Sequence, residues 1–197
     1  LKTSEIRQPV DLSTIAQSIL EDQGIPYRGA IVEYMENKAT ALRRRYYLDA
    51  LAGMGLTVFG DPEWGGIHAG PLRACYAGRR LDYQTELPQL YASAKINLNI
   101  YHVQCIHAPN PRVYDVLACG GFLLTTYNPG LEDEFEIGRH LDVFHTKEEL
   151  VEKVHYYLGQ ESKRREIAQQ GQAHVLAKYG YHDRMQTFLH AIVRPEG

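Results

Sequence analysis

Apolar residues recur every three to four positions in the first quarter of the chain, which is the spacing of an amphipathic helix. Residues 9–22 form the first such stretch, with Asp11 placed to cap its start and Gly24 placed to stop it. Residues 30–52 predict a longer, more highly charged helix with a less regular apolar set. Its middle carries three consecutive arginines, 43–45, for which a solvated helix face is the simplest interpretation.

The last third of the chain has the same helical spacing. Thr146 and Glu149 form the pattern of a capping box at the start of a helix. The buried stripe of that helix is Leu150, Val151, Val154, Tyr157 and Leu158. Residues 161–179 predict a second helix, interrupted at Gly171. A third helix opens at Asp183 and turns four side chains inward: Met185, Phe188, Leu189 and Ile192.

Short apolar runs alternate with short helical segments in the middle of the chain. Strands are predicted at 56–59, 79–83, 95–100, 122–126 and 141–144, and short helices at 86–94, 111–119 and 130–135. Residues 61–78 are rich in glycine and proline and predict a loop. Asn97 and Asn99 alternate with apolar neighbours, so one face of their strand is polar. We therefore predict an α/β fold with a parallel, Rossmann-like sheet and flanking helices.

The stretch from Asn110 to Gly120 specifies one short helix through local signals. Asn110 suits the N-cap, Pro111 the first helical position and Gly120 the stop. One helix face is Val113, Val116 and Leu117, and another is Arg112, Asp115 and Cys119. Because this helix follows a strand, its N-terminus lies at the carboxyl edge of the sheet, where α/β folds bind ligands and a helix N-terminus favours a diphosphate. The spacing also allows Arg112 and Asp115 to form only a surface ion pair.

Composition narrows the class of protein. The chain has 197 residues, 44% of them hydrophobic, which excludes disordered and coiled-coil classes. Its net charge of −3 gives no basic excess that would indicate a nucleic-acid partner or an anionic membrane. No apolar run has the length of a membrane span, and the first residues do not show the pattern of a signal peptide. Three scattered cysteines indicate a reducing, cytoplasmic compartment.

Residues 90–127 contain this helix followed by Gly-Gly-Phe-Leu-Leu-Thr-Thr-Tyr, and they resemble the C-terminal domain of GT-B glycosyltransferases. The resemblance is closest to the spore-maturation CgeB-like group among the group 1 glycosyl transferases, and it covers residues 86–190, more weakly from 56. It implies two Rossmann-like domains that face a cleft, of which the C-terminal one holds the nucleotide-sugar donor. On this basis, residues 56–197 are the donor-binding domain and residues 1–55 a helical segment or linker.

The resemblance also implies the activity, which is transfer of a sugar from a nucleoside-diphosphate sugar to an acceptor that the sequence does not identify. In relatives, an acid in this helix accepts hydrogen bonds from the donor ribose, and the matching residue is Asp115. Many retaining relatives carry a Glu-x7-Glu pair, but His107 stands at the first position here, which leaves retention or inversion open. The candidate donor contacts are Asn110, Arg112, Asp115, His107, Arg43, Tyr83 and Glu132.

No metal or other cofactor is expected, because a helix dipole and basic side chains can neutralise the leaving diphosphate. No catalytic residue is assigned, since a general base would come from the N-terminal GT-B domain. We expect that domain to belong to a longer parent protein, because this chain begins with Leu, and we expect the chain to be inactive alone. Two alternatives stay open: a non-catalytic nucleotide-sugar binding or scaffolding domain, and an unrelated α/β phosphate-ester enzyme.

Several other side chains have chemically reactive groups. Three residues of types that bind metals follow the predicted strand 95–100: His102, Cys105 and His107. His68 is a more distant fourth candidate, and the spacing of these residues is not that of a closed zinc site. Further candidates for the cleft lining are Asp61, Glu63 and Trp64. Cys119 falls at a helix C-terminus, where the dipole disfavours a thiolate, so a structural role is expected. The chain lacks the glycine-rich nucleotide motif, the phosphate loop and the nucleophile elbow, which argues against dehydrogenases, NTPases and hydrolases.

Overall fold

The computed structural model describes residues 12–24, 29–62, 70–105, 107–180, 185–186, 188–190 and 192. The α-helices are α1 (Leu12–Asp22), α2 (Gly29–Leu48), α4 (Leu72–Cys75), α5 (Leu87–Ser93), α6 (Pro111–Ala118), α7 (Lys147–Gly159) and α8 (Glu161–Lys178). The strands are β1 (Asn97–Asn99), β2 (Leu123–Thr126) and β3 (Asp142–Phe144), and the 3-10 helices are η2 (Asp49–Leu51) and η3 (Pro129–Leu131). Asp11 and Asp183, expected at helix starts, lie outside the described residues.

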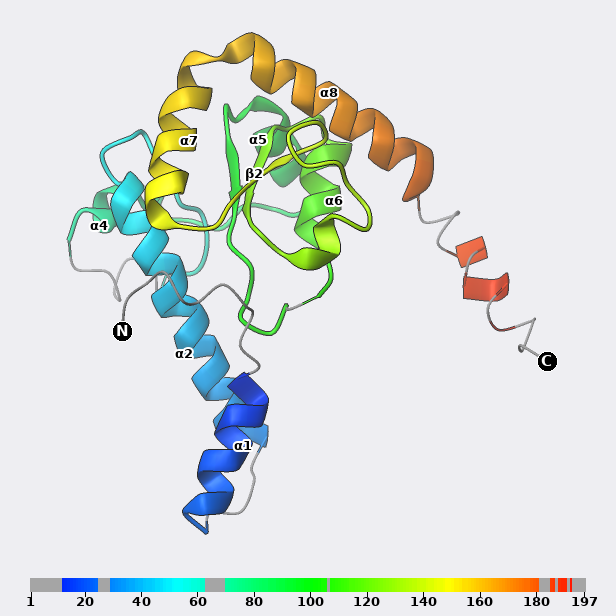
Figure 1. Cartoon of the computed structure of the whole chain (residues 1–197). Coiled ribbons are helices and arrows are strands. Elements are labelled where there is room, and N and C mark those ends of the chain that lie inside the picture. Colours follow the sequence, from blue (N-terminus) through cyan, green and yellow to red (C-terminus); the bar gives the residue numbers. More distant parts are fainter. Residues whose placement is uncertain are drawn as a thin grey trace.

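The three strands form one parallel sheet in the order β1-β2-β3, which confirms the predicted pairing of these segments. Leu98 lies opposite Leu124, and Thr125 lies opposite Val143. α6 provides the crossover from β1 to β2, as a parallel connection requires. Figure 1 shows this sheet at the centre of the molecule, with α1 and the start of α2 extending away from it.

Two further predicted strands are wrong. In the segment 56–59, only Val58 pairs, through an isolated parallel bridge to Tyr76, and its residues are not buried. The segment 79–83 is irregular, because Asp82 Oδ1 accepts hydrogen bonds from the backbone N–H groups of Gln84 and Thr85 and closes a turn there. The predicted loop 61–78 contains the short helix α4.

The polar face of β1 is buried. Asn97 and Asn99 have exposed fractions of 8% and 0%. Asn97 Nδ2 donates to the backbone carbonyls of Tyr91 and Phe122, at 2.9 and 3.3 Å. Asn99 bonds to side chains at the carboxyl edge of the sheet. These hydrogen bonds offset the cost of burying two amides, so a polar face here marks an internal network.

Apolar side chains pack on both faces of the sheet. One face holds α7 and the end of α2, through Leu124, Phe144, Leu150, Val154, Tyr157, Tyr47 and Leu48. The other face holds α6 and α8, through Leu123, Val143, Val113, Val116, Leu117 and Val175. α6 is therefore fixed between the sheet and α8, with its N-terminus at the carboxyl edge.

The C-terminal helices follow the prediction in part. Thr146 Oγ1 accepts the N–H of Glu149 at 3.1 Å and caps α7. α8 runs through Gly171 without interruption. A glycine is needed at this position because the helix passes close to the His140 backbone: a Cβ at position 171 would lie 2.3 Å from the His140 carbonyl oxygen. The inward orientation predicted for the last apolar side chains is wrong, since they are 50 to 60% exposed: Met185, Phe188, Leu189 and Ile192.

None of the described helices is both long enough and apolar enough to cross a membrane.

Candidate functional site

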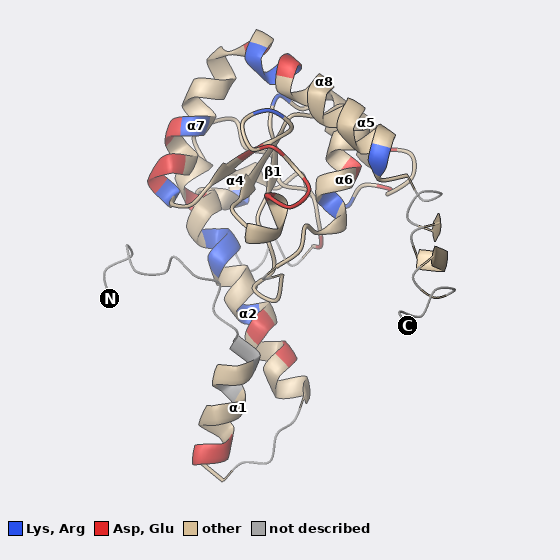
Figure 2. Ribbon diagram, turned by 45° about the vertical axis from the view of Figure 1, so that its right-hand side comes forward, with Lys and Arg blue, Asp and Glu red and all other residues tan. Residues whose placement is uncertain are grey.

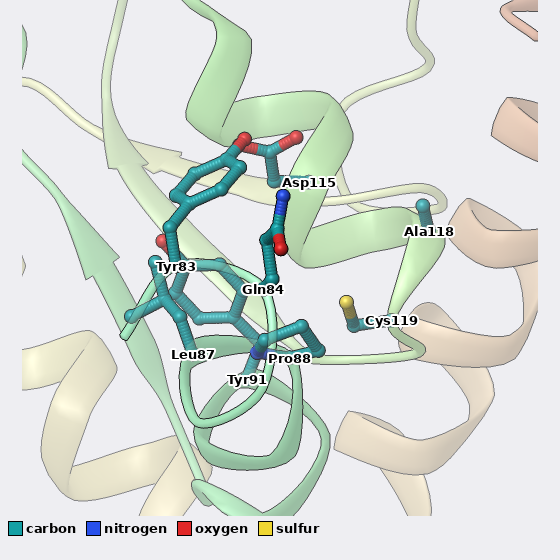
Figure 3. A pocket seen from close by; sticks show the side chains of 8 residues that line it. All are labelled: Tyr83, Gln84, Leu87, Pro88, Tyr91, Asp115, Ala118 and Cys119. Atoms are coloured by element: carbon teal, nitrogen blue, oxygen red, sulfur yellow. The ribbon is translucent and has the colours of Figure 1, made fainter. Parts of the chain in front are cut away.

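A pocket of about 330 Å³ lies between α5 and α6. The turn before α5 contributes Tyr83 and Gln84, α5 contributes Leu87, Pro88 and Tyr91, and α6 contributes Asp115, Ala118 and Cys119. Figure 3 shows the Tyr83 ring reaching across the pocket toward Asp115. The lining thus combines aromatic and aliphatic surface with one carboxylate, a composition typical of small-molecule sites.

Tyr83 and Asp115 are joined directly. The Tyr83 hydroxyl donates to Asp115 Oδ2 at 2.9 Å, although the two residues are 32 positions apart in the chain. The Asp82 turn presents Tyr83 to the pocket, and its ring is 64% exposed. Within the described ranges, no ion pair joins Asp115 to Arg112, so the carboxylate is held toward the pocket by a tyrosine.

Arg112 instead lies near Arg44. Burial lowers the pKa of the Arg44 guanidinium, and the positive charge of Arg112 lowers it further. No carboxylate in the described part of the chain forms an ion pair with either arginine. Figure 2 shows the basic segments in α2 and at the start of α6. Two close guanidinium groups without a counter-charge make this a favourable place for an anion.

Arg43, the arginine singled out from the sequence, lies elsewhere. Burial raises the pKa of the Tyr47 hydroxyl, and the nearby positive charge of Arg43 opposes that rise. That hydroxyl also donates to the His145 carbonyl, at 3.4 Å. The sequence indicates a run of three arginines but does not indicate that Arg44 is the one that faces α6. Tertiary packing sets the rotation of α2 about its axis, and the local sequence pattern does not show it.

Asn110 occupies the N-cap position of α6, but its side chain makes no capping hydrogen bond. It exchanges two hydrogen bonds of 3.3 Å with Asn99, whose Nδ2 also donates to Thr125 Oγ1 at 3.1 Å. The buried amide of Asn99 needs partners, and Asn110 supplies them in preference to capping. Asn110 therefore fixes the start of α6 to the end of β1.

The loop after β1 is tied to the turn after β2. Asn128 Nδ2 donates to the Cys105 carbonyl at 2.8 Å, and Asn128 Oδ1 accepts the Gly130 N–H at 3.0 Å. A Cβ at position 130 would lie 2.0 Å from the carbonyl oxygen of His107, so only glycine fits there. The His107 side chain is exposed. Glu132 is also exposed, and it accepts a hydrogen bond of 3.1 Å from the Tyr127 hydroxyl.

The remaining sequence candidates take structural roles or fall outside the described residues. Within the described ranges, no group of three or more His, Cys, Asp or Glu could hold a metal ion. His102 contacts Asn37 at 3.2 Å, and Asp61 forms an ion pair with Arg80. Burial raises the pKa of the Cys119 thiol, and the nearby carboxylate raises it further, so the thiol stays protonated. Glu63, Trp64 and His68 lie outside the described residues.

The family model described as glycosyl transferase-like matches residues 43–190. Among solved structures, Anabaena Alr3699/HepE in complex with UDP-glucose is similar, with 17% identity and a TM-score of 0.59. The complex of the same Anabaena protein with UDP matches at 16% identity and the same TM-score. The matches cover 76% of this chain and 44% of the Anabaena chain, so this chain spans less than half of that length. No curated protein matches the chain.

Proposed function

Because the chain belongs to the glycosyl transferase-like family, we propose that it binds a nucleoside-diphosphate sugar and is the donor-binding part of a GT-B glycosyltransferase. The observation that carries this proposal is the arrangement along one helix. α6 has the carboxylate of Asp115 in an aromatic pocket and, one turn nearer its N-terminus, Arg112 beside Arg44. A nucleoside followed by a diphosphate matches that order of groups.

Each part of the donor then has a partner. The exposed ring of Tyr83 offers a stacking surface for the base, and Asp115 accepts hydrogen bonds from the ribose hydroxyls. The phosphates extend toward the N-terminus of α6, where the helix dipole and the two arginines stabilise negative charge. As the sugar–phosphate bond breaks, charge grows on the leaving diphosphate, and these groups stabilise it without a metal ion.

The Anabaena complexes support a nucleotide-sugar ligand for this fold, since UDP-glucose and UDP are bound in them. We further propose that the family branch is CgeB-like, that the protein works in the cytoplasm and that residues 56–197 form the donor-binding unit. Arg43, His107, Asn110 and Glu132 are retained as donor-site candidates. The exposed side chains of His107 and Glu132 border the same edge of the sheet as the start of α6.

Catalysis by this chain alone is not expected. A facing domain would position the acceptor and exclude water, and these effects supply several kcal/mol of barrier lowering, up to roughly 7 to 11 in favourable cases. The second candidate function is nucleotide-sugar binding without turnover, which the His107 departure from the Glu-x7-Glu pattern favours. Multiple-turnover transfer by the isolated chain to a defined acceptor would contradict the proposed dependence on a second domain.

Calorimetric titration tests the binding proposal. The chain is titrated with UDP, GDP, ADP and TDP, and with the nucleoside of whichever diphosphate binds. We expect one diphosphate to bind measurably and its nucleoside to bind more weakly, because the nucleoside lacks the groups that face Arg44 and Arg112. Absence of binding to all of these diphosphates would refute the proposed function.

A further inference from the structure

The last residue of β1 has a fully buried amide side chain. Asn99 is 0% exposed and lies where β1 meets the start of α6, two elements that pack against each other (Figure 2). A buried amide needs partners for both its oxygen and its nitrogen. Asn110 Nδ2 donates to the Asn99 oxygen at 3.3 Å, and Thr125 Oγ1 accepts from the Asn99 nitrogen at 3.1 Å. An apolar side chain at position 99 would impose no such requirement on its neighbours.

The requirement of Asn99 decides where the Asn110 side chain lies. Asn110 has φ of −80° and ψ of 162°, the extended conformation of an N-cap residue, and asparagine is among the best N-caps. From this position its side-chain oxygen would ordinarily accept the N–H of the second or third helical residue, Arg112 or Val113. In the structure that oxygen instead accepts from Asn99 Nδ2 at 3.3 Å. Asn99 therefore holds Asn110 away from the end of the helix.

The start of α6 is left open as a result. Pro111 has no N–H, and the Val113 N–H is bonded to the backbone carbonyl of Asn110 at 3.0 Å. The Arg112 N–H has no hydrogen-bond partner among the described residues. It lies at the helix end where the dipole is positive. This backbone donor belongs to the same residue whose guanidinium lies near Arg44.

A second polar group at this point also lacks an acceptor. Tyr101 is 1% exposed, and no residue in the described part of the chain accepts a hydrogen bond from its hydroxyl. The hydroxyl lies beside the backbone of Asn110, and burial raises its pKa, so it stays protonated and able to donate. The start of α6 therefore holds two donors without acceptors, this hydroxyl and the Arg112 N–H. Phosphate oxygens are acceptors that such donors bind.

We propose that Asn99 is a positioning residue of the donor site: by holding Asn110 away from the helix end, it keeps the Arg112 N–H available to a phosphate oxygen of the donor. This role rests on the proposed function, because it concerns the phosphates that the donor would bring. A side chain that capped α6 would occupy the same N–H and would have to be displaced before the phosphate bound. Asn99 acts only through Asn110, since it is itself fully buried.

Hydrogen exchange of the Arg112 backbone amide tests the first step without any nucleotide. The full 197-residue chain is labelled with isotopic arginine, and exchange is followed by NMR. Asn99→Val removes the hydrogen bonds that hold Asn110, which is then free to cap α6, so exchange at Arg112 should slow roughly fivefold. In the double variant Asn99→Val/Asn110→Ala the cap is absent, and exchange should be fast again. Unaltered exchange in Asn99→Val would overturn the proposal.

Calorimetric titration with UDP, GDP, ADP and TDP tests the second step. For the diphosphate that binds, Asn99→Val should weaken the affinity roughly fivefold, and it should weaken binding of the nucleoside less, because only the phosphates compete with the cap. The double variant Asn99→Val/Asn110→Ala should bind the diphosphate more tightly than Asn99→Val does. A purely structural role of Asn99 predicts the reverse, since loss of a second side chain from the same network would add to the damage.

Asn97→Val is the matched control, because Asn97 is a buried amide on the same strand that donates to the backbone carbonyls of Tyr91 and Phe122. It should lower the melting temperature without changing diphosphate affinity or exchange at Arg112. Asn99→Ala, with a smaller side chain, replaces Asn99→Val if the valine variant does not fold. Unchanged diphosphate affinity of the Asn99 variant, or no recovery in the double variant, would overturn the role of Asn99 and leave the proposed function standing. Absence of diphosphate binding to the unmodified chain would overturn both.

Discussion

Asp115→Asn is the substitution that most directly tests the proposed donor site. Asparagine keeps the size of the side chain, and its amide oxygen can still accept the Tyr83 hydroxyl, so the pocket keeps its shape. What is lost is the negative charge that would meet the ribose hydroxyls. A hydrogen bond to a charged group is worth about 1.5 to 3 kcal/mol, which corresponds to roughly a 10- to 150-fold weaker affinity for the bound diphosphate.

Stability should change little in the same variant. The partner of Asp115 is a tyrosine whose ring is 64% exposed, and a hydrogen bond in such a setting contributes no more than about 0.5 kcal/mol. Calorimetric titration of UDP and GDP at matched salt, together with thermal unfolding, separates binding from stability.

Asp49→Asn serves as the control for Asp115→Asn, because Asp49 is an exposed acid with one partner, Arg45, outside the pocket. It should leave both nucleotide affinity and melting temperature unchanged. Equal affinity of Asp115→Asn and the unmodified chain would reduce Asp115 to an ordinary surface acid. A large loss of stability with unaltered affinity would show that its role is structural.

Four further substitutions test other parts of the structure. Arg44→Gln and Arg112→Gln should each weaken binding of the diphosphate roughly tenfold in calorimetric titration while leaving binding of its nucleoside unchanged. His140 stacks on a second histidine at 4.1 Å, and burial, that neighbour and an adjacent arginine lower its pKa. The stabilisation from neutral His140 is therefore complete above the unfolded-state pKa of about 6.5 and is lost as the pH falls through the lower folded-state pKa. Urea unfolding across this range should show the loss, and His140→Gln should flatten it. Gly130→Ala should cost about 1 to 3 kcal/mol of unfolding free energy by thermal or urea unfolding, because its Cβ would meet the His107 carbonyl; unchanged stability would contradict the close approach.

Elements with strong local signals could be predicted from the sequence. α6 has proline at its first position and its apolar side chains on one face, and its bounds fall within one residue of the prediction. The three sheet strands are apolar or alternating runs between helices, which is sufficient to place them and to make them parallel. The segments 56–59 and 79–83 look similar locally. The first lacks a full-length neighbour to pair with, and in the second, side-chain turns compete with the strand.

The candidate site is harder to predict because its groups meet only through tertiary packing. Tyr83 and Asp115 are far apart in sequence, and nothing in their local patterns indicates the hydrogen bond that joins them. Asn110 has every local feature of an N-cap, but the buried amide of Asn99 takes its side chain instead. Buried polar groups at the edge of the sheet can therefore take as hydrogen-bond partners side chains that local sequence rules predict as helix caps.

The orientation of α2 determines where Arg44 lies. Periodicity alone would turn Ile31, Met35 and Leu42 toward the core, yet the helix is rotated so that Thr40 meets the loop after β1. Arg44 lies on the same inward side as Thr40, so the rotation that brings Arg44 to α6 is the one that exposes the apolar residues. A helix rotated to bury those residues would carry Arg44 away from Arg112 and leave the loop donors unpaired, at a cost of about 1 to 3 kcal/mol for each buried group. The pairing of the loop therefore determines where an anion can bind.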